Sequence, residues 1–280
     1  MHKEILDVTE RSRNVYFDTS IYNRLLDDPE KERLLKIIRE KNLIIIPSVI
    51  NLCELLITST PERKKELISI YNEIRNDFHP LKPSPWLLKD SVESVEKGDN
   101  EWEITYPISI NKKMERICHD LASQGGKEIE PYLQGARNYI QEIAKKKRLS
   151  DELQYFSYID SETGQIILLK LFAQICELVE IVFHFNEDTQ FSIIKSPFLP
   201  WKYYLESYAY LFYRRAFPDK KYGKKSNPGP SDLEQCVYLF WTGKFVIEDA
   251  NFLIFLKRLK AIRDYQVNII NYSEFKHYLL

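Results

Sequence analysis

Near its amino terminus the chain reads Val15-Tyr16-Phe17-Asp18-Thr19-Ser20-Ile21-Tyr22, a short apolar strand that ends on an aspartate and passes directly into a helix. Open α/β sheets place their chemistry in the crevice beyond the carboxyl ends of parallel strands. Asp18 stands at such a place. Aspartate, serine and threonine are also ordinary turn and N-cap residues, so a functional role for Asp18 depends on further acids at equivalent positions.

Three more segments of strand length follow, each next to a helical pattern: Leu43–Ile46, Lys244–Ile247 and Val267–Ile270. The uninterrupted Leu43–Ile46 is typical of a strand covered on both faces, and strands joined through helices pair in parallel. We therefore predict an α/β fold with a doubly wound, mostly parallel, Rossmann-like sheet of four to five strands. Helices are expected over 21–26, 29–40, 48–58, 61–75, 231–240, 251–263 and 273–278.

The middle of the chain has a different character and is predicted to be a mostly helical insertion. The Pro-rich stretch His79–Pro85 cannot continue a helix, residues 99–111 look extended or irregular, and helical patterns follow over 113–123, 127–147, 151–158 and 161–185. The predicted organisation is a first sheet-forming part (14–76), the insertion (77–200) and a second sheet-forming part (201–280). The aromatic helix predicted over 200–217 is expected to be core rather than a base-stacking surface.

The amino-acid composition limits the classes of protein to which the chain can belong. The 280 residues carry 40 basic and 41 acidic side chains, so no global charge attracts nucleic acid or membrane. Four widely spaced cysteines argue against a zinc site or a disulfide scaffold. Residues 1–13 do not resemble a signal peptide, and polar residues interrupt the apolar run 166–183 with helical period. We expect a cytoplasmic protein with no membrane segment.

Four acids then fall at comparable places: Asp18 after the first strand, Glu54 in the helix after the second, Asp232 at a helix start, and Asp249 just beyond Lys244–Ile247. Clustered carboxylates repel one another unless a cation neutralises them, and carboxylate oxygens suit Mg²⁺. Each acid also has a structural alternative. Asp249 is placed to cap a helix, and the order Ser231, Asp232, Glu234 fits a capping box. Glu54, among apolar neighbours, has the weakest structural alternative.

The order and spacing of these motifs resemble the PIN-domain nucleases. The resemblance covers about 14–76 and 201–280, and it implies that Asp18, Glu54, Asp232 and Asp249 hold one or two Mg²⁺ or Mn²⁺ ions, with RNA as the usual substrate. The candidate substitutes or supports of these ligands are Glu234, Glu248, Asn51, Asn251 and Thr19. The chain departs from the family pattern at Ile247, where threonine or serine is common, and in the length of its insertion.

The predicted function is therefore a metal-dependent nuclease acting on single-stranded RNA in preference to DNA, as an endonuclease. Phosphate contacts require local positive charge, for which the candidates are Lys220, Lys221, Lys224, Lys225, Arg214 and Arg215; the run 145–148 fits a solvated face better. No Walker-type or G-x-S-x-G motif offers another chemistry. The alternative is an inactive PIN-like module that binds nucleic acid or a partner protein through its insertion. The resemblance also allows a homodimer.

Overall fold

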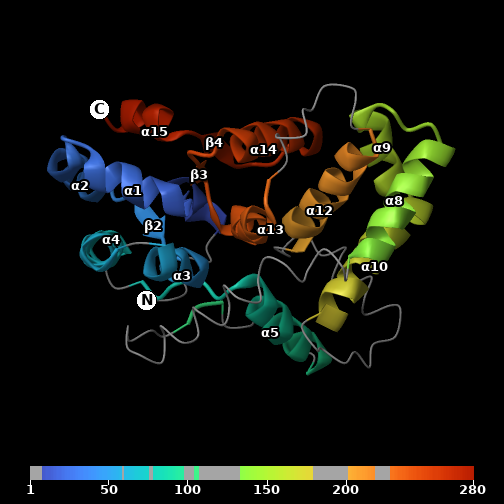
Figure 1. The fold of residues 1–280 in the computed structure, drawn as a ribbon, viewed down its shortest axis with the longest axis horizontal. Coiled ribbons are helices and arrows are strands. Elements are labelled where there is room, and N and C mark those ends of the chain that lie inside the picture. Colours follow the sequence, from blue (N-terminus) through green and yellow to red (C-terminus); the bar gives the residue numbers. More distant parts are fainter. Residues whose placement is uncertain are drawn as a thin grey trace.

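A computed structural model gives the fold (Figure 1) and describes residues 8–58, 60–75, 78–97, 104–106, 133–178, 201–217 and 228–280. At its centre is a four-stranded sheet built from β1 (Asn14–Phe17), β2 (Ile44–Ile46), β3 (Lys244–Val246) and β4 (Asn268–Ile270). The strand order is β2-β1-β3-β4, and all three pairings are parallel. The predicted α/β class and parallel sheet are thus confirmed, with four strands in the described part of the chain.

Both faces of the sheet are covered, because successive side chains of each strand enter different cores. Val15 and Phe17 point into a core formed with α1, α2, α3, α4 and α15, whereas Tyr16 and Phe245 point into a larger core formed with α12, α14 and the 3-10 helix η3. The rings of Tyr16 and Phe245 stack with centroids 4.7 Å apart. This two-sided burial explains why apolar residues predominate in the strands.

The helices of the first and last parts of the chain lie close to their predicted ranges. They are α1 (Thr19–Asp27), α2 (Lys31–Glu40), α3 (Val49–Thr58), α4 (Pro61–Arg75), α13 (Pro230–Glu234), η3 (Gln235–Trp241), α14 (Ala250–Arg263) and α15 (Tyr272–Leu279). The prediction was wrong in extending one α-helix over 231–240, since the α-helix gives way to 3-10 geometry at Gln235. A further 3-10 helix, η2 (Val8–Arg13), precedes β1.

The middle of the chain contributes α5 (Ser84–Glu96), α8 (Gln134–Lys146), α9 (Glu152–Ile159) and α10 (Glu162–Leu178), followed by α12 (Trp201–Ala216). Helices α8, α9, α10 and α12 gather on the side of the molecule opposite α1, α2 and α4 (Figure 1). The sequence analysis did not predict α5; its proline lies in the first turn, where proline is tolerated. The helix expected over 113–123 lies outside the described residues.

The helical block joins the sheet through one shared core. Leu171 of α10 and Leu205 of α12 belong to the same buried cluster as Tyr16 of β1. Ion pairs add a second connection, since Arg263, the last residue of α14, bonds Asp160 at 2.7 Å and also binds Glu206 of α12. As expected, the aromatic helix α12 is almost entirely buried. The block therefore packs directly on the sheet.

Candidate functional site: an acidic cluster at the carboxyl edge of the sheet

The topology creates a crevice between β1 and β3. In the sheet, β2 lies on one side of β1 and β3 lies on its other side, so the order in which strands are added reverses at β1. Phe17 pairs with Val246, so Asp18 and the segment from Ile247 to Asp249 leave the sheet at the same edge. The amide of Asp18 donates to the carbonyl oxygen of Val246 at 2.9 Å. Such a switch in strand order is where open α/β sheets bind ligands.

Asp18 is held at this edge from two directions. Its side chain is 7% exposed; the Ser20 hydroxyl donates to Oδ2, and the Gln235 amide Nε2 donates to Oδ1 at 3.3 Å. Burial raises the pKa of Asp18, while the hydrogen bonds from Ser20 and Gln235 act in the opposite direction. The carboxyl group is therefore fixed in position by donors but pays a desolvation penalty when ionised.

Glu54 approaches from α3, two helical turns after Pro47. The Thr19 hydroxyl donates to Glu54 Oε2, and Asn51 Nδ2 donates to that hydroxyl oxygen at 3.1 Å. Burial raises the pKa of Glu54 to about 7; the Thr19 bond opposes this, and the charges of Asp18 and Asp232 add to it. Glu54 thus experiences the fields of two acids that are far away in sequence.

A series of buried polar side chains holds Thr19, and through it Glu54, in position. Asn51 and Ser48 are both fully buried. Ser48 Oγ donates to Asn51 Oδ1 at 2.9 Å, and the Tyr16 hydroxyl lies 3.0 Å from Ser48 Oγ. Because Asn51 Oδ1 is occupied by Ser48, its Nδ2 is directed to Thr19. Thr19 and Asn51, both expected as supports, bond to one another, and Thr19 bonds to Glu54.

Asp232 reaches the cluster from the short helix α13. Its Oδ2 accepts from the backbone amide of Gly229 at 2.7 Å, so Asp232 itself bonds back to the helix start. The capping box predicted with Ser231 as the N-cap was therefore wrong by two residues, since the N-cap is Gly229 and α13 begins at Pro230. Burial raises the pKa of Asp232 to about 6, helped by the charges of Asp18 and Asp249. Burial, with the charge of Glu54, raises the pKa of Glu234 to about 8.

Asp249 lies at the exposed rim and serves as the N-cap of α14, because its Oδ1 accepts from the Phe252 amide at 2.7 Å. Its neighbour Glu248 pairs with Arg24 of α1 at 2.7 Å. Asn251 is half-buried in the first turn of α14. Ile247 is fully buried. Asp249 is thus structurally a cap, and it is linked to the other acids through its effect on Asp232.

The oxygen donors at this edge suit a hard cation by their chemistry. Within the described part of the chain, however, no three His, Cys, Asp or Glu side chains lie close enough together to hold one metal ion. One oxygen each of Glu54, Asp232 and Asp249, and both oxygens of Asp18, accept hydrogen bonds from neighbouring groups. The carboxylates therefore face a common edge without converging on one point.

Gln235 is a further residue of this site that the sequence analysis missed. It is 1% exposed, and its Oε1 has no hydrogen-bond partner among the described residues, although its Nε2 binds Asp18. A buried acceptor without a donor is costly, and a cation or its water would satisfy it. The residue type and donor set thus fit a hydrated cation. The only sequence signal was a lone polar residue before an apolar run, one turn after Asp232.

The predicted nucleic-acid contacts have different outcomes. Arg214 is 2% exposed, and its guanidinium group lies 5.6 and 5.5 Å from the ring centroids of Tyr210 and Phe255. Its prediction as a surface contact was therefore wrong, because cation–π packing buries it. Arg215 is half-buried at the end of α12. The four lysines predicted in the loop before α13, Lys220, Lys221, Lys224 and Lys225, lie outside the described residues.

Comparison of the chain with models of protein families, with curated proteins and with solved structures finds no match. No helix among the described residues is long and apolar enough to cross a membrane.

Proposed function

We propose that the chain is a metal-dependent nuclease that hydrolyses phosphodiester bonds of single-stranded RNA. The observation that carries the proposal is electrostatic. Asp18, Glu54 and Asp232 come from three separate segments, and the pKa of each is raised in the folded chain. Each also acts on another: Asp18 raises the pKa of both Glu54 and Asp232. Such mutual repulsion at a ligand-binding edge is relieved by a divalent cation.

In this proposal the ion is bound by Asp18, Glu54 and Asp232. Asp249, at the exposed rim, is the fourth ligand. Glu234 and Glu248 are the alternative ligands. When bound, Mg²⁺ or Mn²⁺ acidifies a water molecule and stabilises the negative charge that develops on the phosphodiester. The supporting groups act on the ligands. Ser20 and Gln235 orient Asp18 through hydrogen bonds.

Thr19, itself held by Asn51, orients Glu54. The resemblance to PIN-domain nucleases implies RNA as the substrate. The proposed phosphate contacts are Arg215 and the four lysines that precede α13 in the sequence.

The test is cleavage of labelled single-stranded RNA and DNA by the purified chain in Mn²⁺, Mg²⁺ or EDTA. We expect cutting of RNA that requires the metal and falls on the order of a hundredfold or more in Asp18→Asn and Glu54→Gln. Glu32→Gln is the matched control, because Glu32 is a glutamate of α2 whose side chain is 82% exposed. Equal cleavage by the variants and the wild type would reject the assignment of the site.

A second candidate function is favoured by one specific observation. The acids do not converge on one point in this conformation, as expected if they were remnants in a module that binds nucleic acid or a partner protein without cutting. In that case the chain would bind RNA equally in EDTA and Mn²⁺ and would leave it intact. The same cleavage assay, combined with a binding measurement, separates the two candidates.

A further inference from the structure

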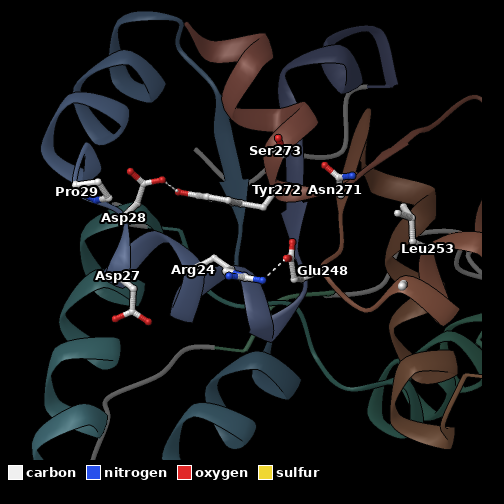
Figure 2. Close-up of a pocket in the computed structure, with 10 residues that line it drawn as sticks. Arg24, Asp27, Asp28, Pro29, Glu248, Leu253, Asn271, Tyr272 and Ser273 are labelled. Atoms are coloured by element: carbon white, nitrogen blue, oxygen red, sulfur yellow. Dashed lines mark hydrogen bonds and ion pairs between the residues drawn. The ribbon is translucent and has the colours of Figure 1, made fainter.

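A pocket of about 510 Å³ opens next to the acidic cluster, at the carboxyl edge of β3 and β4 (Figure 2). Glu248 and Ala250, the two chain neighbours of Asp249, line one side of it. Residues that follow β4, including Tyr272, line another, and the end of α1 with Arg24 supplies a third. We call this cavity the edge pocket. Because these residues flank Asp249, a strand of RNA bound at Asp249 would lie directly beside the edge pocket.

One wall of the edge pocket is an aromatic ring held in place. The Tyr272 hydroxyl donates to Asp28 Oδ2 at 3.0 Å, so the ring spans the distance between the start of α15 and the end of α1 (Figure 2). Pro29, Ala250 and Leu253 add apolar surface. An aromatic ring with apolar neighbours is the usual partner of an unstacked nucleobase in single-stranded RNA.

The charged groups that line the edge pocket are already paired, which disfavours a phosphate as its occupant. Asp27 and Asp28 pair with an arginine and a lysine outside the lining, and Arg24, the one cation among the described lining residues, is paired with Glu248 at 2.7 Å (Figure 2). The 2.7 Å contact of that pair is to Oε1 of Glu248. The second carboxylate oxygen is an acceptor suited to an N–H donor. The pocket therefore favours a neutral, flat group that carries an amino group.

We propose that the edge pocket binds the base of a nucleotide adjacent to the cleaved phosphate in single-stranded RNA. This inference rests on the proposed nuclease function and adds a specificity site to it. The base stacks on Tyr272, and an amino group on its pairing edge donates to Glu248. Adenine, cytosine and guanine carry such a group, whereas uracil offers only its N3–H, flanked by two carbonyl oxygens that a carboxylate repels. The volume suits one nucleoside, since small-ligand pockets usually measure about 300–1,000 Å³.

The test measures binding of fluorescent tetranucleotides of adenosine, cytidine or uridine to the full chain in EDTA and in Ca²⁺. We expect adenosine and cytidine oligonucleotides to bind more tightly than the uridine one. Tyr272→Leu removes the ring and is expected to weaken adenosine binding about tenfold. Tyr272→Phe keeps the ring while losing the bond to Asp28, so it is expected to bind as the wild type does. Ser273→Trp, at an exposed lining position, is expected to block the pocket.

The outcomes separate this inference from the proposed function. Equal binding by Tyr272→Leu and the wild type, equal loss in the Phe and Leu variants, or no binding of any oligonucleotide overturns the base site. Cleavage by the wild type in Mn²⁺ is scored independently, so base binding without cleavage keeps the base site but rejects the nuclease and, with it, the placement beside a cleaved phosphate. Thermal melts of each variant ensure that only folded proteins are compared.

Discussion

Replacing Glu54 by glutamine is expected to stabilise the chain above pH 7 when divalent cations are absent. Glu54 lies in a partly buried position beside two other acids, and burial raises its pKa from the ordinary value of 4.5 to about 7. Glutamine keeps the oxygen that accepts from Thr19 and removes the charge. The variant therefore represents the neutral form of the side chain at every pH.

The direction of the pH dependence follows from this raised pKa. Below about pH 4.5 the carboxyl group is protonated in both the folded and the unfolded chain, so glutamine gives no advantage. Between about 4.5 and 7 the unfolded chain loses this proton while the folded chain retains it, and the free energy of unfolding of the wild type falls. Above about pH 7 both forms are ionised and the difference becomes constant.

The magnitude follows from the size of the pKa difference. One pKa unit corresponds to about 1.36 kcal/mol, so the rise from 4.5 to about 7 gives a gain of up to about 3 kcal/mol in Glu54→Gln at pH 8. Mn²⁺ should cancel most of this gain. At a concentration of 100 times its dissociation constant, a cation that binds only the folded wild type adds about 2.7 kcal/mol.

The assay is urea unfolding followed by circular dichroism between pH 4 and 9, first in EDTA and then in Mn²⁺. Glu32→Gln, a change at an exposed site of α2, serves as the control and should show no such pH dependence. The reasoning is refuted if Glu54→Gln is less stable than the wild type at pH 8 in EDTA, or if its gain does not change with pH.

Two further predictions concern stability. Arg263→Met should destabilise the chain by about 3–5 kcal/mol in urea unfolding, because Glu206 is 1% exposed and would lose its cation while Tyr265 still donates to it; adding Glu206→Gln should recover most of this loss, and no recovery would contradict the charge argument. Asp249→Ala should lower stability by about 1 kcal/mol through loss of the cap to the Phe252 amide, whereas Asp249→Asn should retain it; equal melting temperatures of the two variants would contradict the capping role.

The sheet could be predicted because its signals are local. Each strand is a short, mostly apolar segment next to a helix signal, and burial on both faces explains that composition. The structure places Val15 and Tyr16 in the two different cores. The position of Asp18 directly after β1 likewise followed from sequence order alone. The helix α5 was missed because the prolines before it were interpreted as a break, although proline is compatible with a first helical turn.

The features that sequence reasoning missed depend on tertiary contacts. Arg214 looked like a surface cation, but packing between α12 and α14 brings Phe255 against its guanidinium group. Gln235 carries no motif and joins the site only because η3 lies beside β1, where its amide reaches Asp18. The edge pocket combines α1 with segments more than two hundred residues later in the chain. No local pattern in the sequence predicts it.

The most direct measurement is an anomalous difference map from crystals of the chain grown or soaked in Mn²⁺. The account predicts a peak at the carboxyl edge of β1 and β3, bound by oxygens of Asp18, Glu54 and Asp232, with their side chains turned toward it from the positions described above. A well-ordered map with no peak at that edge, or with manganese bound only elsewhere, would contradict the proposal that these acids form a metal site.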